Sequence, residues 1–291
     1  MKPAFKWTAL ALVICLPLSA QAHRAWMQPS ATVLSGDDSW ITVDAAVSND
    51  LFYFEHVPLL LEGIGTPLQA PAASGQAPMR RPPSQLQIIA PDGSSIAAEN
   101  GNIGHYRTTF DVQLKQKGTY KLAVANSGLL ATWKDKDQPR RWMGKASELA
   151  NNVPANAADL KVTQSDSRME TFVTSGNPTR TVLKPTNQGL ELVPITHPND
   201  LFAGETAEFS LLIDGKPAKN LEVNITPGGN RYRSETGEIE RKTDEQGKFS
   251  VTWPVAGMYW LQAETTSTQG VAKPANERRA SYSATLEVLA P

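Results

Sequence analysis

The chain has 291 residues, of which 40% are hydrophobic and 20% charged, with 28 basic against 29 acidic side chains. This near-neutral balance argues against a nucleic-acid or anionic-membrane partner, because proteins that bind such partners concentrate positive charge. A chain of this length can bury a core without disulfides. Its single cysteine, Cys15, lies in a segment that we expect to be removed, which would leave no thiolate metal ligand and no cysteine nucleophile.

Residues 1–22 predict a cleaved signal peptide. Lys2 and Lys6 precede an apolar run, and Ala20–Ala22 supplies the small-x-small pattern that signal peptidase recognises. The apolar run is shorter than the roughly 20 residues that a membrane span needs, so we expect no membrane insertion. Cleavage after Ala22 predicts a periplasmic protein that begins at His23.

Short runs of alternating apolar and polar residues predict strands in the first half of the chain. They cover residues 40–47, 85–89, 108–114 and 119–125. Residues 63–84 are rich in proline, alanine and glycine, which indicates a long surface loop or insertion. Residues 145–160 have the composition of one or two short helical turns, and residues 176–188 resemble a linker.

The alternation is cleaner in the second half, where six strands fit into about 100 residues, as is typical of an immunoglobulin-like sandwich. We predict strands at residues 190–195, 206–213, 221–226, 248–253, 258–265 and 281–289, with Trp253 and Trp260 in the core of this sandwich. The predicted protein is therefore all-β with two immunoglobulin-like β-sandwich domains, long loops and one or two short helical turns. Residues 1–22 would be the signal peptide, 23–187 the amino-terminal domain with the 63–84 insertion, and 188–291 the carboxy-terminal domain.

The expected mature chain has four histidines, His23, His56, His105 and His197. A terminal His23 would offer an α-amine and an imidazole on one residue, which together can chelate a transition metal. Histidines and carboxylates without thiols suit copper, nickel, zinc or iron. No HxH, HxxxH or HExxH pair is present, so a metal site would have to be assembled from distant segments. The alternative is that cleavage happens to fall before a histidine.

One tetrapeptide, Asn-Asp-Leu-Phe, occurs at residues 49–52 and again at residues 199–202, with a histidine a few residues away each time. We predict that the two copies meet near the domain junction and bring His56 and His197 towards His23. Asparagine and aspartate also cap turns, so each copy could equally be ordinary turn chemistry. In the metal-site hypothesis, carboxylates near the metal would come from Glu55, Asp50 and Asp200.

Motifs for catalysis are absent from the sequence. It contains no Gly-x-Ser-x-Gly elbow, no phosphate-binding glycine loop and no dinucleotide fingerprint. The basic pair Arg278-Arg279 could line an anion site or could form salt bridges on a solvated face. The sequence therefore favours a binding protein over an enzyme.

Several motifs carry a resemblance to a known family. The opening at residues 23–30 (HRAWMQPS) resembles the start of a large periplasmic family of unknown function, often described as a component of nickel or cobalt uptake. Residues 189–194 (GLELVP), 214–218 (DGKPA) and 257–260 (GMYW) are similar to the carboxy-terminal sandwich of that family. The resemblance implies exported metal handling. The family variant with Asn-Asp-Leu-Phe segments is often encoded beside TonB-dependent receptors and membrane reductases of iron acquisition, so the resemblance also implies these partners.

These observations favour a periplasmic protein that binds a transition metal or a metal chelate during uptake. The metal could be nickel, cobalt, copper, iron or zinc, and the receiving partner a membrane transporter or a TonB-dependent receptor system, with a membrane reductase as a further possible partner. One alternative is a copper enzyme with a histidine brace, in which a second histidine lies close to His23. Another is a metal-free protein-interaction module.

Overall fold

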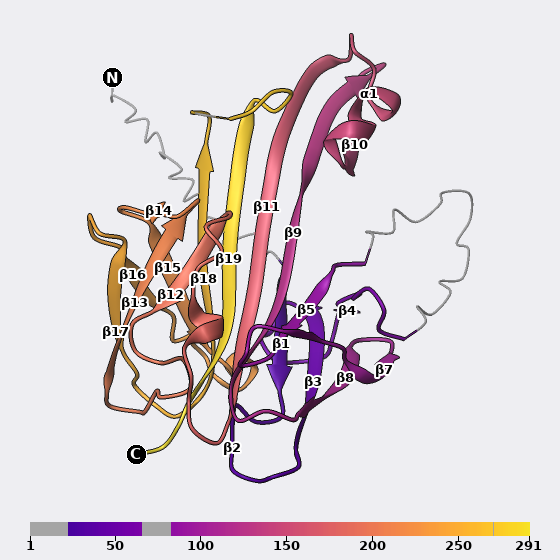
Figure 1. Ribbon diagram of the computed structural model, residues 1–291. Helices are drawn as coiled ribbons and strands as arrows, with labels where there is room; N and C mark the ends of the chain where they lie inside the picture. Colours follow the sequence, from indigo (N-terminus) through magenta and orange to yellow (C-terminus); the bar gives the residue numbers. More distant parts are fainter. Residues whose placement is uncertain (1–22, 66–82, 270) are drawn as a thin grey trace, which may run out of the picture.

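The computed structural model describes residues 23–65, 83–269 and 271–291. It consists of three β-sheets with a few short helical turns between strands (Figure 1), so the predicted all-β class with two immunoglobulin-like sandwiches is confirmed. The predicted signal peptide and most of the predicted insertion at 63–84 lie outside the described residues. Within the described part of the chain, no helix has the length and apolar character that crossing a membrane requires.

A ten-stranded central sheet runs through the molecule and receives strands from both halves of the chain. Its longest strands are the 18-residue β9 and β11, which lie antiparallel and pair from Ser175↔Gly118 to Ala158↔Lys134. The strands of this sheet are β2 (Val33–Leu34), β5 (Leu86–Ile89), β6 (Ser95–Ile96), β9 (Gly118–Asp135), β10 (Gln138–Gly144), β11 (Ala158–Ser175), β15 (Glu222–Pro227), β16 (Ile239–Lys242), β18 (Gly257–Ser267) and β19 (Glu277–Val288).

Two smaller sheets cover parts of the central sheet. The amino-terminal sheet contains β1 (Arg24–Pro29), β3 (Ser39–Ser48), β4 (Val57–Pro58), β7 (Glu99–Ile103) and β8 (Thr108–Leu114). The carboxy-terminal sheet contains β12 (Leu190–Pro194), β13 (Thr206–Ile213), β14 (Lys216–Pro217) and β17 (Lys248–Thr252). The short helices are η1 (Ala146–Glu148), α1 (Leu149–Asn152), η2 (Thr181–Leu183) and η3 (Asn230–Tyr232).

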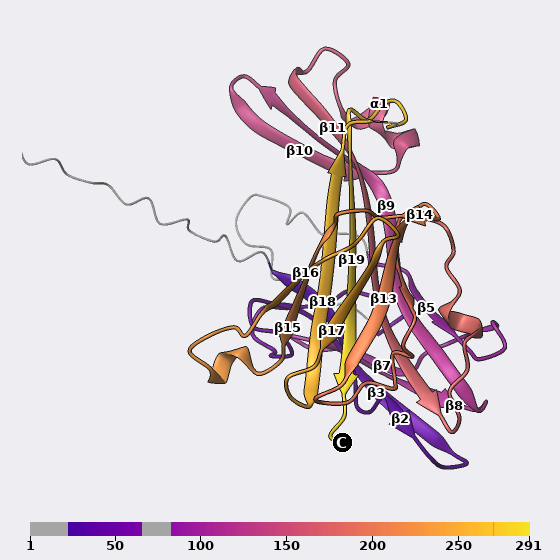
Figure 2. The ribbon, with the colours of Figure 1, turned by 90° about the vertical axis from the view of Figure 1, so that its left-hand side faces the viewer.

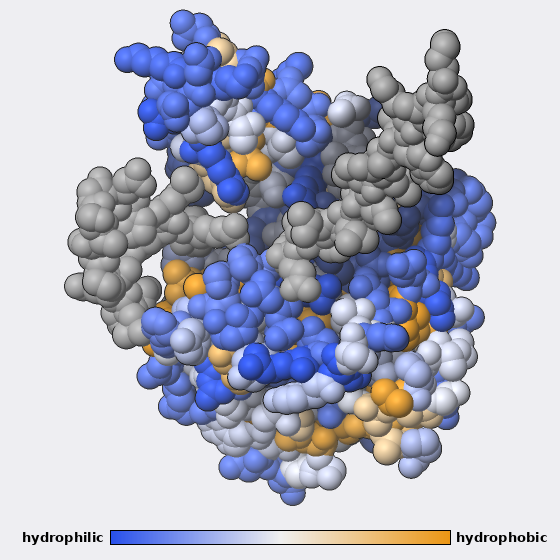
Figure 3. Space-filling model, turned by 180° about the vertical axis from the view of Figure 1, so that it is seen from behind, coloured by the Kyte–Doolittle hydropathy of each residue, from blue (hydrophilic) through white to orange (hydrophobic). Residues whose placement is uncertain are grey.

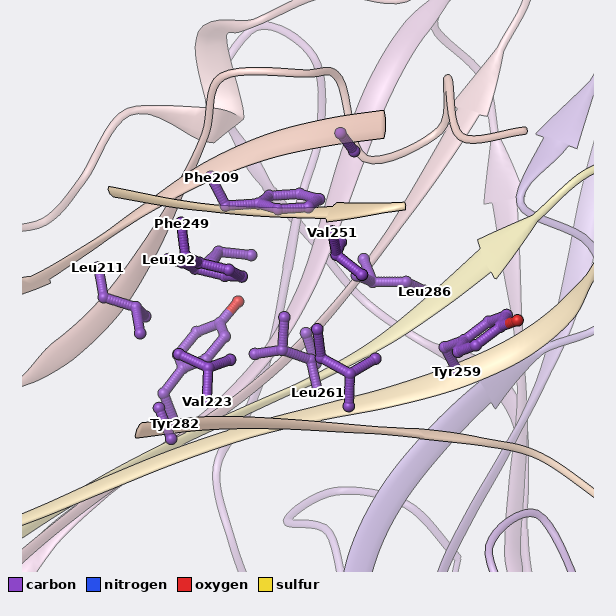
Figure 4. Close-up of a cluster of buried hydrophobic side chains, with 14 of the residues drawn as sticks. Leu192, Phe209, Leu211, Val223, Phe249, Val251, Tyr259, Leu261, Tyr282 and Leu286 are labelled. Atoms are coloured by element: carbon purple, nitrogen blue, oxygen red, sulfur yellow. The ribbon is translucent and has the colours of Figure 1, made fainter. Parts of the chain in front are cut away.

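The two outer sheets pack on opposite faces of the central sheet. Successive side chains of a strand point to opposite faces, and in β11 Met169 and Val173 belong to the core under the amino-terminal sheet. Phe172 belongs instead to the core under the carboxy-terminal sheet. In that second core, Phe209 and Phe249 face Tyr282 and other side chains of the central sheet (Figure 4). The protein is therefore two sandwiches that share one layer.

This shared layer crosses the predicted boundary at residue 187. β11, from the first half, pairs in parallel with β19, from the second, between Thr163↔Glu277 and Thr171↔Thr285. A buried charged group spans the same junction, where Glu170 accepts a hydrogen bond from the Tyr282 hydroxyl at 2.9 Å. Independent folding of residues 188–291 stays a prediction, and the parallel pairing is what such a fragment would have to lose.

Of the two tryptophans predicted for the second core, only one lies there. Trp253 is fully buried in the second core. Trp260 is also buried, but alternation along β18 points it to the other face, where it packs with Trp26 and Leu51 from the amino-terminal half. The second tryptophan therefore ties the two halves together instead of filling one core.

A third, smaller core stabilises an arm at one end of the molecule, where β9, β10 and β11 continue past the outer sheets (Figure 2). It contains Leu129 and Val162 with Trp133 and Trp142 packed against them. The predicted helical turns at 145–160 are present here as η1 and α1. Seen from behind, the surface is largely hydrophilic with separate apolar patches (Figure 3).

Candidate functional site

The register of the amino-terminal sheet brings together two of the predicted metal ligands. β1 and β4 both pair with the last residues of β3, one on each side. His23 and His56 directly precede these two strands. Their imidazole rings stack, with 3.9 Å between the ring centroids and 18° between the ring planes. Both residues are exposed, so an ion in solution can reach them.

Asn49 connects this histidine pair to the loop that follows β3. The Nδ1 atom of His23 lies 2.9 Å from the Oδ1 atom of Asn49. The backbone N–H of Asn49 donates in turn to Oε1 of Glu55 at 2.6 Å. Glu55, predicted as a carboxylate near the metal, thus uses one of its oxygens to hold the Asn49 backbone.

The loop at residues 49–56 is held in one conformation by its surroundings. Phe52 has a φ of 60°, in the left-handed region that bulky residues rarely adopt. The ring of Phe52 meets Trp26 edge-on at 5.4 Å, and Phe54 packs on the same tryptophan at 5.4 Å. A side chain on Gly228 would lie 2.7 Å from Phe52, so this position needs glycine. Backbone strain of this kind costs about 1–3 kcal/mol and persists only where the neighbours impose it.

Arginine side chains surround the loop. The guanidinium of Arg231 lies 4.1 Å from the ring centroid of Tyr53 and 3.7 Å from the carboxylate of Asp50. Arg107 lies 4.5 Å from the ring centroid of Phe54. Asp50 therefore pairs with a cation on η3, and its carboxylate connects the loop to the second half of the chain.

His197 occupies a different, buried environment. Its side chain is 6% exposed, and its Nε2 atom lies 3.0 Å from the Thr119 hydroxyl and 3.2 Å from the Thr179 carbonyl oxygen. Its Nδ1 atom accepts a hydrogen bond from the Asn199 N–H at 3.2 Å. Burial lowers the pKa of His197 below the ordinary histidine value, while the hydrogen bond to Thr179 acts in the opposite direction. Both ring nitrogens are engaged, which leaves no lone pair for a metal.

The two Asn-Asp-Leu-Phe segments pack into different cores. Leu51 belongs to the small cluster around Trp26, and Leu201 to the core under the carboxy-terminal sheet. Asp200 is exposed. His56 contacts His23, whereas His197 bonds Thr119 and Thr179, so the expectation that both histidines approach His23 holds for His56 alone. In the described part of the chain, no group of three or more histidine, cysteine, aspartate and glutamate side chains is arranged to hold a metal ion. Any site at His23 and His56 must take its further donors from elsewhere.

A polar cleft of about 330 Å³, which the sequence did not predict, lies where the central sheet emerges beyond the carboxy-terminal sheet. Arg278 lies in this cleft, where its guanidinium bonds to Asp166 at 2.6 Å and to Asp214. These ion pairs, chiefly the bond to Asp214, raise the pKa of Arg278. Its charge is thus matched by the protein itself, in agreement with the salt-bridge interpretation of the Arg278-Arg279 pair.

Comparison with known proteins gives a family but no activity. The model of a family described as a domain of unknown function, DUF4198, matches residues 20–267. No curated protein is similar to the chain at a significant level.

Among solved structures, the D0–D1 domain of intimin is 12% identical, with a TM-score of 0.20, and the alignment covers 90% of this chain and 97% of that one. An Escherichia coli alpha-2-macroglobulin activated by porcine elastase is 12% identical, covering 92% and 20%, with a TM-score of 0.22. A marsupial T cell receptor is 8% identical, covering 93% and 74%, with a TM-score of 0.20. Similarities at this level indicate neither a shared ligand nor a shared partner.

Proposed function

We propose that this chain, which belongs to the DUF4198 family through the match over residues 20–267, is an exported protein that binds a transition-metal ion at His23 and His56 and assists its uptake. The observation that carries the proposal is the stacked, solvent-exposed pair of imidazoles, with ring centroids 3.9 Å apart, beside a strained and well-packed loop. Residues far apart in the sequence supply the two rings, and one of them is the residue that cleavage after Ala22 would expose as a terminus.

Cleavage would give the site a third nitrogen. The α-amine of a terminal His23 and its own Nδ1 atom can close a six-membered chelate ring on a metal, whereas Nε2 points away from the amine. A nitrogen of His56 would complete a set of three nitrogen donors and leave other positions for water or for a ligand carried with the ion. Nitrogen donors of this kind suit copper, nickel, cobalt and zinc, with copper the tightest in vitro whatever the cell supplies.

The proposal is tested on the exported protein purified from the periplasm, with its first residue fixed by intact mass. Titration calorimetry with Cu(II) and Ni(II) should show one site, which His23→Ala abolishes and which His56→Ala weakens by at least tenfold. His105→Ala is the matched control, because His105 is exposed and its ring meets Tyr106 edge-on instead. A protein carrying one extra alanine before His23 keeps both imidazoles but moves the amine, and should lose most of the affinity.

Two results would contradict the proposal. A mature protein that starts at another residue would have no terminal histidine chelate. Equal affinity in the wild type, His23→Ala and His56→Ala would show that any binding lies elsewhere. Loss of binding in His23→Ala alone would reduce the site to a terminal chelate without His56.

The stacked pair also favours the second candidate, a copper enzyme with a histidine brace, because that chemistry needs a second histidine beside a terminal one. The same samples distinguish the two functions. Cu(II) binding without peroxide-dependent oxidation of a test substrate supports a carrier, while turnover that disappears in His56→Ala supports an oxidative enzyme. In the carrier case, delivery to a membrane transporter or a TonB-dependent receptor system follows as the partner part of the proposal.

A further inference from the structure

We infer that Asn49 and the ring of His56 form a latch that holds metal-free His23 in a form unable to chelate, and that metal binding must release it. This inference rests on the proposed function, since it concerns the same site. Asn49 acts through His23 and is a positioning residue. It has no counterpart among the ligands predicted from the sequence.

The hydrogen bond to Asn49 decides which nitrogen of His23 carries the proton. An amide oxygen only accepts hydrogen bonds, so the 2.9 Å contact with Oδ1 of Asn49 requires a proton on Nδ1 of His23. That nitrogen is the one the amine chelate needs, because it alone can close the six-membered ring. In the neutral ring the proton must therefore move through solvent from Nδ1 to Nε2 before a metal can take its place.

The stacked ring of His56 adds a geometric barrier. A nitrogen ligand bonds a metal in the plane of its ring, at about 2.0–2.1 Å. Two ring planes that lie 18° from parallel, with centroids 3.9 Å apart, cannot both contain one ion at that distance. At least one imidazole must rotate out of the stack, and His23 can do so only by breaking its hydrogen bond to Asn49.

The latch is fixed at its other end. Glu55 accepts the backbone N–H of Asn49 at 2.6 Å, and the packing of Phe52 on Trp26 holds the loop between them. The Asn49 amide is thus positioned before any ligand arrives. Metal binding must break the hydrogen bond between His23 and Asn49, which lowers the metal affinity. One neutral hydrogen bond of this kind changes an equilibrium constant by about 2- to 10-fold.

The first test reads the proton directly in the metal-free protein. Long-range ¹H–¹⁵N spectra of the mature chain above neutral pH should show the Nδ1–H tautomer for His23. Asn49→Ala should shift His23 towards the Nε2–H tautomer, while Asn151→Ala, an exposed asparagine on α1, should leave it unchanged. Asn49→Ser, whose hydroxyl can also accept, should restore part of the Nδ1–H population.

The second test measures Cu(II) affinity in the same proteins. Asn49→Ala should bind Cu(II) about 2- to 10-fold more tightly than the wild type, and Asn151→Ala should bind as the wild type does. An Nε2–H tautomer in the wild type, or equal or weaker Cu(II) binding in Asn49→Ala, would overturn the latch. If no variant binds metal, the proposed function fails, while the tautomer measurement still decides whether Asn49 holds the Nδ1 proton.

Discussion

The two Asn-Asp-Leu-Phe segments have the same sequence and opposite environments. In the second copy, Asn199 uses its side chain within the fold, accepting from the Thr174 hydroxyl at 2.9 Å and donating to the Phe172 carbonyl at 2.9 Å. In the first copy, the side-chain oxygen of Asn49 bonds the exposed ring of His23 instead. The phenylalanine differs as well, since Phe52 has the left-handed φ of 60°.

This difference teaches that the layer behind each segment decides its role. The second copy lies against the central sheet, whose threonines take up both its asparagine and its histidine. The first copy follows the end of β3 and lies over the small cluster around Trp26, where its asparagine bonds an exposed ring and its aspartate pairs with η3. One copy therefore reads as structural and the other as a place where a ligand can bind, although neither the letters nor the spacing distinguish them.

The largest expected effect concerns the leucine of each segment, whose removal should destabilise the protein to different extents. Leu201 is 1% exposed in the large core, and Leu201→Ala should lower the free energy of unfolding by about 2–5 kcal/mol. Leu51→Ala should fall at the lower end of that range, because the small cluster around it can collapse more easily into the gap. Urea unfolding of both variants measures this, and equal losses would remove the contrast in packing.

The two histidines near the segments should have opposite effects on stability and on metal binding. His197→Ala should lower the free energy of unfolding by about 1–3 kcal/mol, because it removes the hydrogen-bond partner of the Thr179 carbonyl oxygen and of the Asn199 N–H. His56→Ala should change it by less than about 0.5 kcal/mol, as is usual for exposed side chains. Metal affinity should follow the reverse order. A His197→Ala protein that folds normally but fails to bind metal would show that the second segment belongs to the site after all.

A pH dependence should follow from the burial of His197. Its folded-state pKa is lowered by burial, so below the unfolded value of about 6.5 the unfolded chain binds more protons than the folded one. Stability should therefore fall as pH falls through that value, and be unaffected by this group above it. Urea midpoints measured between about pH 7.5 and 5.5 should slope less in His197→Asn than in the wild type. Parallel slopes would mean that His197 titrates alike in both states.

The sequence predicted the fold where the signal is local. Residues 206–213 alternate cleanly and form β13 with those bounds. It failed where pairing is distant: the strand predicted at 119–125 continues to Asp135, through Asn126, Ser127 and Gly128. Those three residues favour turns on their own, but β11 pairs with all of them and overrides that preference. The shared central sheet was invisible for the same reason, because its parallel β11–β19 pairing joins segments about a hundred residues apart.

The candidate site was predictable only in part. The sequence identified His23 and His56 as candidate metal ligands. Their contact, however, depends on the register of β1 and β4 on β3, which the sequence does not reveal. The repeat of four residues argued for His197 as a third ligand, and it misled because repetition says nothing about what packs behind a segment. Thr119, which lies 78 residues from His197 in sequence, supplies the hydrogen bond that removes it from consideration.

The smallest expected effect concerns the two aspartates. Asp50 accepts a hydrogen bond from the Asn230 amide at 3.3 Å and faces Arg231 at 3.7 Å, so it joins the first segment to η3. Asp200 is exposed at the surface. Asp50→Ala should therefore lower the free energy of unfolding by about 0.2–1 kcal/mol, the usual range for partly exposed ion pairs. Because salt screens such pairs, the loss should shrink at high ionic strength, while Asp200→Ala should leave stability unchanged at any salt. Equal and salt-independent effects in both variants would show that the Asp50 contacts do not hold the loop, and the order of the His23–His56 pair would then rest on the aromatic packing around Trp26 and on the hydrogen bond between Asn49 and Glu55.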